Sequence, residues 1–163
     1  MTFVCNAGPV IALAKIDRLS LLRDLAVSVL IPETVFHEVL AKPGLDSSRI
    51  LIASRSFLSV RVPVGNVDPA VQFASRNLDA GEREVIALAS SIPAPVTAVL
   101  DDAAGRRVAF QLGLPLLGFI GILLIAKQRQ LITTVNPLLE QARSQGYWLA
   151  DELIKIAKSL AKE

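Results

Sequence analysis

The chain has 163 residues and a mass of 17.5 kDa, which suits a single domain, residues 1–163, with a substantial hydrophobic core. Apolar residues make up 52% of it and the mean hydropathy is +0.51. We therefore expect densely buried elements or an apolar surface that a partner covers. The net charge of +2 is too small to argue by itself for a nucleic-acid partner.

The sequence contains no segment that we expect to cross or enter a membrane. The uncharged stretch 112–126 is interrupted by Pro115 and by glycines, and it is shorter than the ~20 apolar residues of a spanning helix. No basic leader precedes the first apolar run, and Cys5 is the only cysteine, which excludes an intramolecular disulfide. These features predict a cytoplasmic protein in a reducing environment.

Strand-like apolar runs alternate with segments of helical spacing along the whole chain. The predicted strands are residues 3–5, 27–32, 57–62, 96–100 and 114–118. The predicted helices are residues 9–16, 19–25, 34–41, 46–54, 78–90, a segment ending at 112, 119–128, 136–145 and 151–162. Residues 63–69 are expected to form a loop. This alternation predicts an α/β fold in which a parallel sheet carries helices on both faces, and the closing helices 136–163 are expected to pack on that domain.

Polar residues stand where several of these elements begin or end. Because parallel strands end at one edge of the sheet, and helices that start there lean over it, we expect these side chains to converge. The candidates come from four places in the chain: Asn6, Glu38, Glu82 with Glu84, and Asp101 with Asp102.

Clustered carboxylates repel each other, so they must bind a cation, share protons or lie further apart. A ligand set made only of oxygen atoms suits Mg²⁺ or Mn²⁺, and such an ion can activate water for attack on a phosphodiester. Each residue also has a purely structural explanation, since acids cap and stabilise helix starts. Asn6 alone could be an ordinary turn residue.

Five sequence stretches, by their residues and their order, favour a shared metal site over purely structural roles for these side chains. They are VCNAGPVIALAKIDRLSLL, VLIPETVFHEVL, LDAGEREVIALA, VLDDAAGRRVAFQLGL and LLGFIGILLIAKQRQLI, which together fall between residues 3 and 132. In this order they resemble the PIN-domain proteins, in particular their VapC-like branch. The closing residues 146–163 are also similar to the tail of that branch.

The resemblance implies a three-layer α/β/α sandwich with a central parallel sheet. It implies a Mg²⁺- or Mn²⁺-dependent endoribonuclease, often the toxin of a toxin–antitoxin pair, with RNA as substrate, an antitoxin as protein partner and a homodimer as the assembly. By position, the acids that hold the metal would be Glu38, Glu82 or Glu84, and Asp101 or Asp102, with Glu38, Glu82 and Asp101 as the first choice for catalysis.

Asn6 departs from the family pattern, because that position usually carries an aspartate. An amide oxygen can ligate a hard cation, but it brings no charge, so weaker metal binding is expected. Gly8 also replaces a small hydroxyl residue. The alternative function is therefore a catalytically weakened PIN-fold module that binds nucleic acid or another protein.

The remaining signals indicate no other chemistry. His37 is the only histidine, which rules out a zinc site or a serine triad, and we expect it on a helix surface. Tyr147 and Trp148 could stack on a base, but we expect them to anchor the C-terminal helix. Four basic side chains could contact phosphates or could be ordinary exposed charges: Arg106, Arg107, Lys127 and Arg129.

Overall fold

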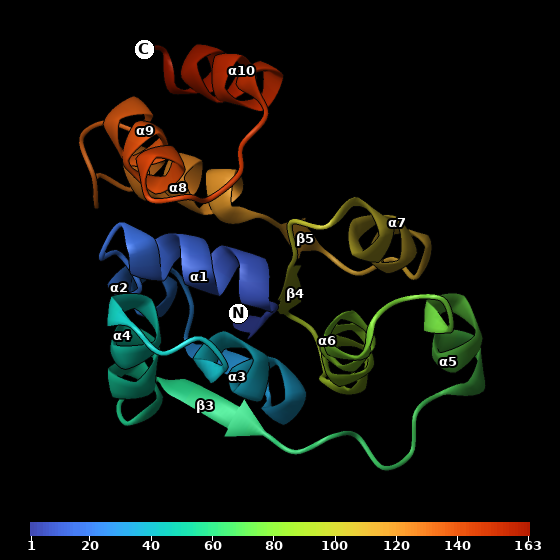
Figure 1. Ribbon diagram of the computed structural model, residues 1–163. Helices are drawn as coiled ribbons and strands as arrows, with labels where there is room; N and C mark the ends of the chain where they lie inside the picture. Colours follow the sequence, from blue (N-terminus) through green and yellow to red (C-terminus); the bar gives the residue numbers. More distant parts are fainter.

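A parallel sheet of five strands forms the centre of the computed structural model, which describes residues 1–163 (Figure 1). The order of the strands is β3-β2-β1-β4-β5, and all four pairings are parallel. The strands are β1 (Thr2–Cys5), β2 (Ser28–Pro32), β3 (Leu58–Arg61), β4 (Val96–Val99) and β5 (Leu116–Leu117).

Ten helices surround this sheet. They are α1 (Ala7–Lys15), α2 (Ser20–Leu25), α3 (Glu33–Leu40), α4 (Leu45–Ser54), α5 (Pro69–Ser75), α6 (Ala80–Ser91), α7 (Ala103–Gln111), α8 (Phe119–Gln128), α9 (Asn136–Ser144) and α10 (Asp151–Ala161). Helices α1, α4 and α8 pack together on one side of the sheet, whereas α6 packs on β1, β2 and β4 from the other side with α5 and α7 beside it (Figure 1). Helix α10 packs against α8 and α9, and α9 also packs against α1.

This architecture confirms the predicted α/β class with a central parallel sheet between helical layers. The observed elements agree with the predicted ranges to within a few residues, except for α5. That helix begins at Pro69, where a loop was predicted to end, and no helix was predicted after it. Asp68 caps α5 by accepting a hydrogen bond from the backbone N–H of Ala70 at 2.8 Å. Aspartate followed by proline at the first helical position is a start signal that the sequence did contain.

The last helix is fastened to the rest of the molecule through Glu163. Its carboxylate accepts hydrogen bonds from Lys127 Nζ at 2.6 Å and from the backbone N–H groups of Val135 and Asn136 at 2.7 and 2.8 Å. Burial alone would raise the pKa of Glu163, but these donors outweigh it and lower the pKa to about 2. Lys127 is therefore a structural contact between α8 and the end of α10. None of the helices has the length and apolar character needed to cross a membrane.

The order of the strands creates a crevice at the carboxyl ends of β1 and β4. From β1 the chain moves outward through β2 and β3, with the connecting helices α1 and α4 packed together and α3 in contact with both α1 and α6. It then returns to β4 and continues to β5 in the opposite direction, with α6 and α7 on the opposite side of the sheet from α1. The helices that follow β1 and β4 thus diverge, and open α/β sheets bind ligands where such a reversal occurs.

Candidate active site

The two central strands bring Asn6 and the aspartate pair to the same edge of the sheet. Asn6 directly follows β1, and its backbone N–H donates a hydrogen bond to the carbonyl of Val99, the last residue of β4, at 3.0 Å. Asp101 and Asp102 lie two and three residues after Val99. The predicted convergence of these strand ends is therefore present.

The side chain of Asn6 is not used as a helix cap. Asn6 occupies the N-cap position of α1, yet its amide makes no hydrogen bond to the backbone of that helix. Its Oδ1 faces Gly81 instead: a Cβ atom on Gly81 would lie 3.5 Å from Asn6 Oδ1 and 3.1 Å from Glu38 Oε2. The absence of a side chain at Gly81 lets the start of α6 approach these two oxygens closely, and Val35 also borders this narrow space, 3.2 Å from the same Cβ position.

Glu82 lies beside this space and is almost completely buried, with 7% of its surface exposed. Its backbone N–H donates to Asp79 Oδ1 at 2.8 Å, and its own carboxylate accepts from the backbone N–H of Asp79 at 3.4 Å, so the pair forms a capping box. The Glu82 carboxyl is also hydrogen-bonded to Asp102. Asp102 in turn caps α7 by accepting from Ala104 N and Gly105 N at 2.7 and 3.0 Å.

Burial and neighbouring acids shift the pKa values of these carboxyl groups. Burial first, and then the charges of Asp79 and Asp102 and the hydrogen bond with Asp102, raise the pKa of Glu82 from 4.5 to about 7. Burial and the charge of Asp79 also raise the pKa of Glu38. The pKa of Asp102 is lowered, chiefly by the Gly105 N–H, against the opposing effect of its burial. These opposite shifts make Glu82 the carboxyl that keeps its proton to higher pH and Asp102 the one that loses it first.

Asp79 belongs to this acidic group but was not among the predicted residues. Its charge acts on both Glu38 and Glu82, so it lies near both carboxyl groups. The sequence did hold a signal for its local role, because Asp79 and Glu82 have the spacing of a capping box.

Asp101 has hydrogen-bond partners outside the group of acids. Its Oδ1 accepts a hydrogen bond from the backbone N–H of Phe119 at 3.0 Å, and its Oδ2 accepts from the Tyr147 hydroxyl at 2.6 Å. A Cβ atom on Gly118 would lie 2.5 Å from Asp101 Oδ1, so this approach requires glycine. Asp101 thereby links β4 to the start of α8 and to Tyr147.

Glu84 is also directed elsewhere, although it is only two residues from Glu82. Its Oε1 accepts a hydrogen bond from the Thr34 hydroxyl in the first turn of α3 at 2.7 Å, and its Oε2 is buried without a partner. Of the predicted residues, Asn6 and Glu38 meet at Gly81, and Glu82 meets Asp102. Glu84 and Asp101 have separate partners.

The donor atoms gathered here suit a hard divalent cation. No group of three acidic, cysteine or histidine side chains is placed to hold a metal ion. Mg²⁺ needs only one or two direct carboxylates and keeps several waters, so the free amide of Asn6, Glu38 and the Glu82–Asp102 pair fit such an ion. A cation would also offset the burial of Glu82 and the charges of Asp79 and Asp102, which together raise its pKa.

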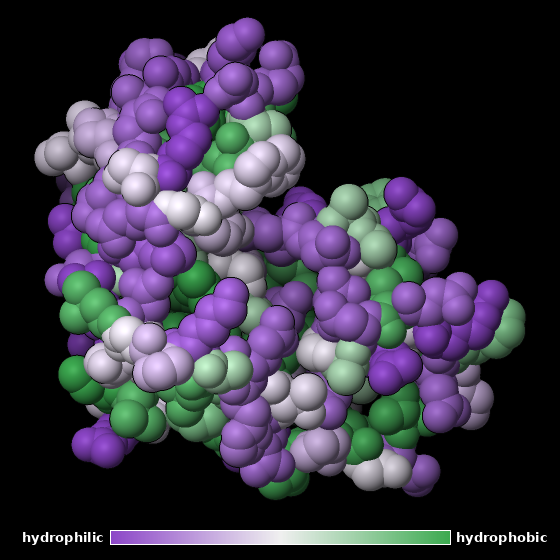
Figure 2. Space-filling model, in the orientation of Figure 1, coloured by the Kyte–Doolittle hydropathy of each residue, from purple (hydrophilic) through white to green (hydrophobic).

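A cavity of about 820 Å³ adjoins the acids on the side of α8 and α10. Asp101, Asp102 and Arg106 line one end of it, and Tyr147 and Trp148 lie along its wall. Figure 2 shows the outline of the molecule notched between α10 and α7. The Arg106 guanidinium donates to the carbonyl oxygen of Leu100 at 2.8 Å, so it is held at this opening next to the aspartates.

The two neighbouring aromatic residues of this wall have different surroundings. Tyr147 packs edge-on against Phe119, and burial followed by the charge of Asp101 raises its pKa. It anchors the C-terminal segment as predicted. Trp148 is 80% exposed, so its predicted anchoring role is wrong, because its neighbour already fills the space over α8. His37 is exposed on α3, as expected.

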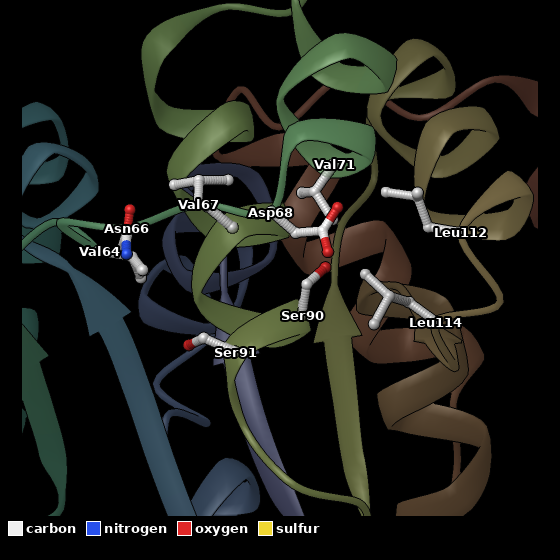
Figure 3. A pocket seen from close by; sticks show the side chains of 10 residues that line it. Val64, Asn66, Val67, Asp68, Val71, Ser90, Ser91, Leu112 and Leu114 are labelled. Atoms are coloured by element: carbon white, nitrogen blue, oxygen red, sulfur yellow. The ribbon is translucent and has the colours of Figure 1, made fainter.

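A second cavity, of about 370 Å³, lies between α5, α6 and the end of α7 (Figure 3). Asp68 and Ser90 face each other across it, while Val71, Leu112 and Leu114 form apolar walls (Figure 3). None of the predicted site residues lines this cavity. The candidate active site is therefore the acidic group at the carboxyl edge of the sheet.

Comparison with known families agrees with this placement. The model of a family described as a PIN domain matches residues 2–163. The chain belongs to the PIN-domain family. No curated protein matches it.

Membership of this family confirms the predicted PIN fold and indicates a nuclease-type function. PIN domains generally use divalent metal ions, and membership of the family suggests nucleic-acid binding. The family model is not specific to the VapC-like branch, so that closer assignment stays a prediction.

Proposed function

We propose that this PIN domain is an endoribonuclease that depends on Mg²⁺ or Mn²⁺. One observation carries the proposal: oxygen donors from three distant segments surround the start of α6, with Asn6 and Glu38 facing Gly81 and with Glu82 hydrogen-bonded to Asp102. The pKa of Glu82, raised to about 7, supports a site built for charge that a ligand balances.

Within this proposal each side chain has a defined task. Asn6, Glu38, Glu82 and Asp102 would hold the ion, which when bound supplies Lewis-acid stabilisation of charge on a phosphodiester and lowers the pKa of water. Asp102 is our choice for the fourth family position, because it shares a hydrogen bond with Glu82 whereas Asp101 caps α8. Arg106 would contact a phosphate at the mouth of the site.

The wider biological setting rests on the sequence rather than on the geometry. The similarity of the five sequence stretches to the VapC-like branch supports a toxin that acts on RNA in the cytoplasm, with an antitoxin protein as its partner. A homodimer belongs to the same proposal.

Glu38→Gln is the direct test of this activity. The variant keeps the size of the side chain but removes a charged donor, so we expect cleavage of mixed RNA substrates with Mg²⁺ or Mn²⁺ to fall by at least about tenfold. Glu33→Gln in the same helix is the matched control, because Glu33 pairs only with His37 at the surface. Equal rates in all three proteins, or cleavage that persists in a metal chelator, would contradict the proposal.

The neutral Asn6 favours the second candidate function, a binding module of reduced activity. Asn6→Asp places a second carboxylate opposite Glu38, and an additional charged oxygen should strengthen Mn²⁺ binding by roughly tenfold. Titration of Mn²⁺ by calorimetry checks the affinity, and RNA cleavage by the same variant checks the rate. If affinity rises without cleavage in either protein, the binding module is the better description. If affinity is unchanged, Asn6 is not a ligand.

A further inference from the structure

Trp148 is a large aromatic residue that contributes little to the packing of the fold. It is the only tryptophan of the chain, and 80% of its surface is exposed. Its ring packs on no other aromatic ring and on no guanidinium group, and the preceding Tyr147 already anchors this segment to Phe119 and Asp101. A single exposed apolar residue is ordinary, so the surroundings of the ring decide whether it binds a ligand.

The surroundings of Trp148 form a site of the size and composition that small ligands occupy. The ring lies in the wall of the 820 Å³ cavity, which opens at the notch between α7 and α10 (Figure 2). Most of that wall is apolar, with side chains from β5, α8 and α10: Leu117, Ile120, Leu153 and Ile156. Protein pockets for small molecules are typically about 300–1,000 Å³ and mostly apolar, with a few polar groups that orient the ligand. The cavity therefore fits the flat face of an aromatic ligand.

The polar end of the cavity indicates the charge of that ligand. Asp101, Asp102 and Arg106 line this end, and Asp102 is one of the four proposed ion ligands. The Arg106 guanidinium is held by the carbonyl oxygen of Leu100 at 2.8 Å, and Arg106 takes part in none of the ion pairs of the structure. A guanidinium has several N–H donors, so Arg106 keeps donors that can bind a phosphate. A nucleotide combines such an anion with a flat ring.

We propose that this cavity is a nucleobase subsite, in which Trp148 stacks on an unpaired base of the substrate RNA while Arg106 contacts an adjacent phosphate. The subsite rests on the proposed function for its substrate, because a phosphodiester held at the acids leaves the neighbouring nucleotide beside the cavity. Stacking on an aromatic side chain tolerates any base, since every base has a π face. Bases inside a duplex are already stacked on their neighbours, so the subsite admits single-stranded RNA and not duplex.

Fluorescence of the only tryptophan reports directly on the subsite. The intact chain is titrated at low salt with single-stranded RNA of about eight nucleotides, in a metal chelator that keeps the RNA uncleaved. We expect saturable quenching of Trp148 by the single strand, and little quenching by the same RNA annealed to its complement. Equal quenching by single strand and duplex would overturn the proposal, as would an emission that does not respond to RNA.

Trp148→Ala measures what the ring contributes to affinity. We expect it to raise the dissociation constant for a labelled single strand by roughly tenfold, and Trp148→Phe, which keeps an aromatic face, to raise it by less than about threefold. Phe110→Ala is the matched control, because Phe110 on α7 is 79% exposed and does not line the cavity. Equal affinities of the wild type and Trp148→Ala, or equal losses in Trp148→Ala and Phe110→Ala, would overturn the proposal.

Cleavage of the same RNA with Mg²⁺ or Mn²⁺ separates the subsite from the nuclease activity. RNA binding that depends on Trp148, without cleavage, supports the subsite and contradicts the nuclease. Cleavage that Trp148→Ala leaves unchanged at subsaturating RNA supports the nuclease and overturns the subsite. A second copy of the chain is the competing occupant of this cavity. If the Trp148 emission shifts to shorter wavelength with protein concentration alone, and RNA does not change it, the subsite is overturned.

Discussion

Asp102→Asn is expected to reduce metal-dependent RNA cleavage by about two orders of magnitude while leaving the fold intact. Loss of one charged donor removes several kcal/mol of transition-state stabilisation at a catalytic ion. Asparagine is as good an N-cap as aspartate, so the hydrogen bonds to Ala104 N and Gly105 N persist. Rates are measured with excess Mg²⁺ or Mn²⁺, and thermal unfolding of the same sample verifies the fold.

The neighbouring substitution Asp101→Asn provides the matched comparison. Asp101 accepts from two donors, Phe119 N and the Tyr147 hydroxyl, and an amide offers only one oxygen. We expect a loss of about 1–3 kcal/mol of stability, with cleavage at a temperature where the variant is folded kept within a few-fold. The reverse pattern, in which Asp101→Asn abolishes cleavage and Asp102→Asn does not, would assign the fourth position to Asp101.

Glu82→Gln is expected to stabilise the protein at pH 8 while it lowers cleavage. Burial and the charges of Asp79 and Asp102 raise the pKa of Glu82 from 4.5 to about 7, so ionisation costs the folded state up to about 3 kcal/mol. Glutamine carries no charge and still satisfies the capping box. An active-site group that reduces stability is a common sign of function.

The dependence on pH follows from the direction of this shift. Below pH 4.5 Glu82 is protonated in both the folded and the unfolded chain, so wild type and variant should differ little. The advantage of the variant grows from pH 4.5 to 7, as the unfolded wild type loses the proton that the folded state keeps. Above pH 7 it is constant. Urea unfolding in a metal chelator checks this, and a variant that is less stable at every pH would contradict it.

Hydrophobic spacing predicted most of the fold because the three central strands β1, β2 and β4 are mostly buried and the helices are amphipathic. β4, for example, is buried at all four positions and stood out as an apolar run. Helix α5 was missed because Pro69–Ser75 is short and only Val71 and Ser75 of it are buried. Its start signal, Asp68 followed by Pro69, comes at the end of a run of turn residues. The whole run 63–69 was therefore predicted as a loop.

Side-chain directions were the part of the site that the sequence could not provide. Asp101 and Asp102 are adjacent, and only the packing of Gly118 and Tyr147 against the first of them separates their roles. Glu82 and Glu84 differ in the same way, since Thr34 engages the second. The effect of the Asp79 charge on Glu38 depends on how α3 packs against α6. The spacing of residues along the chain does not reveal that packing.

The central claim is that Asn6, Glu38, Glu82 and Asp102 surround one ion-binding position at the start of α6. A crystal soaked in Mn²⁺ and measured for anomalous scattering tests it most directly. We predict a single strong peak beside Gly81, within reach of Asn6 Oδ1, Glu38 and the Glu82–Asp102 pair. A peak held by Asp101 or Glu84 instead, or a fully soaked crystal with no peak at this edge of the sheet, would contradict the account.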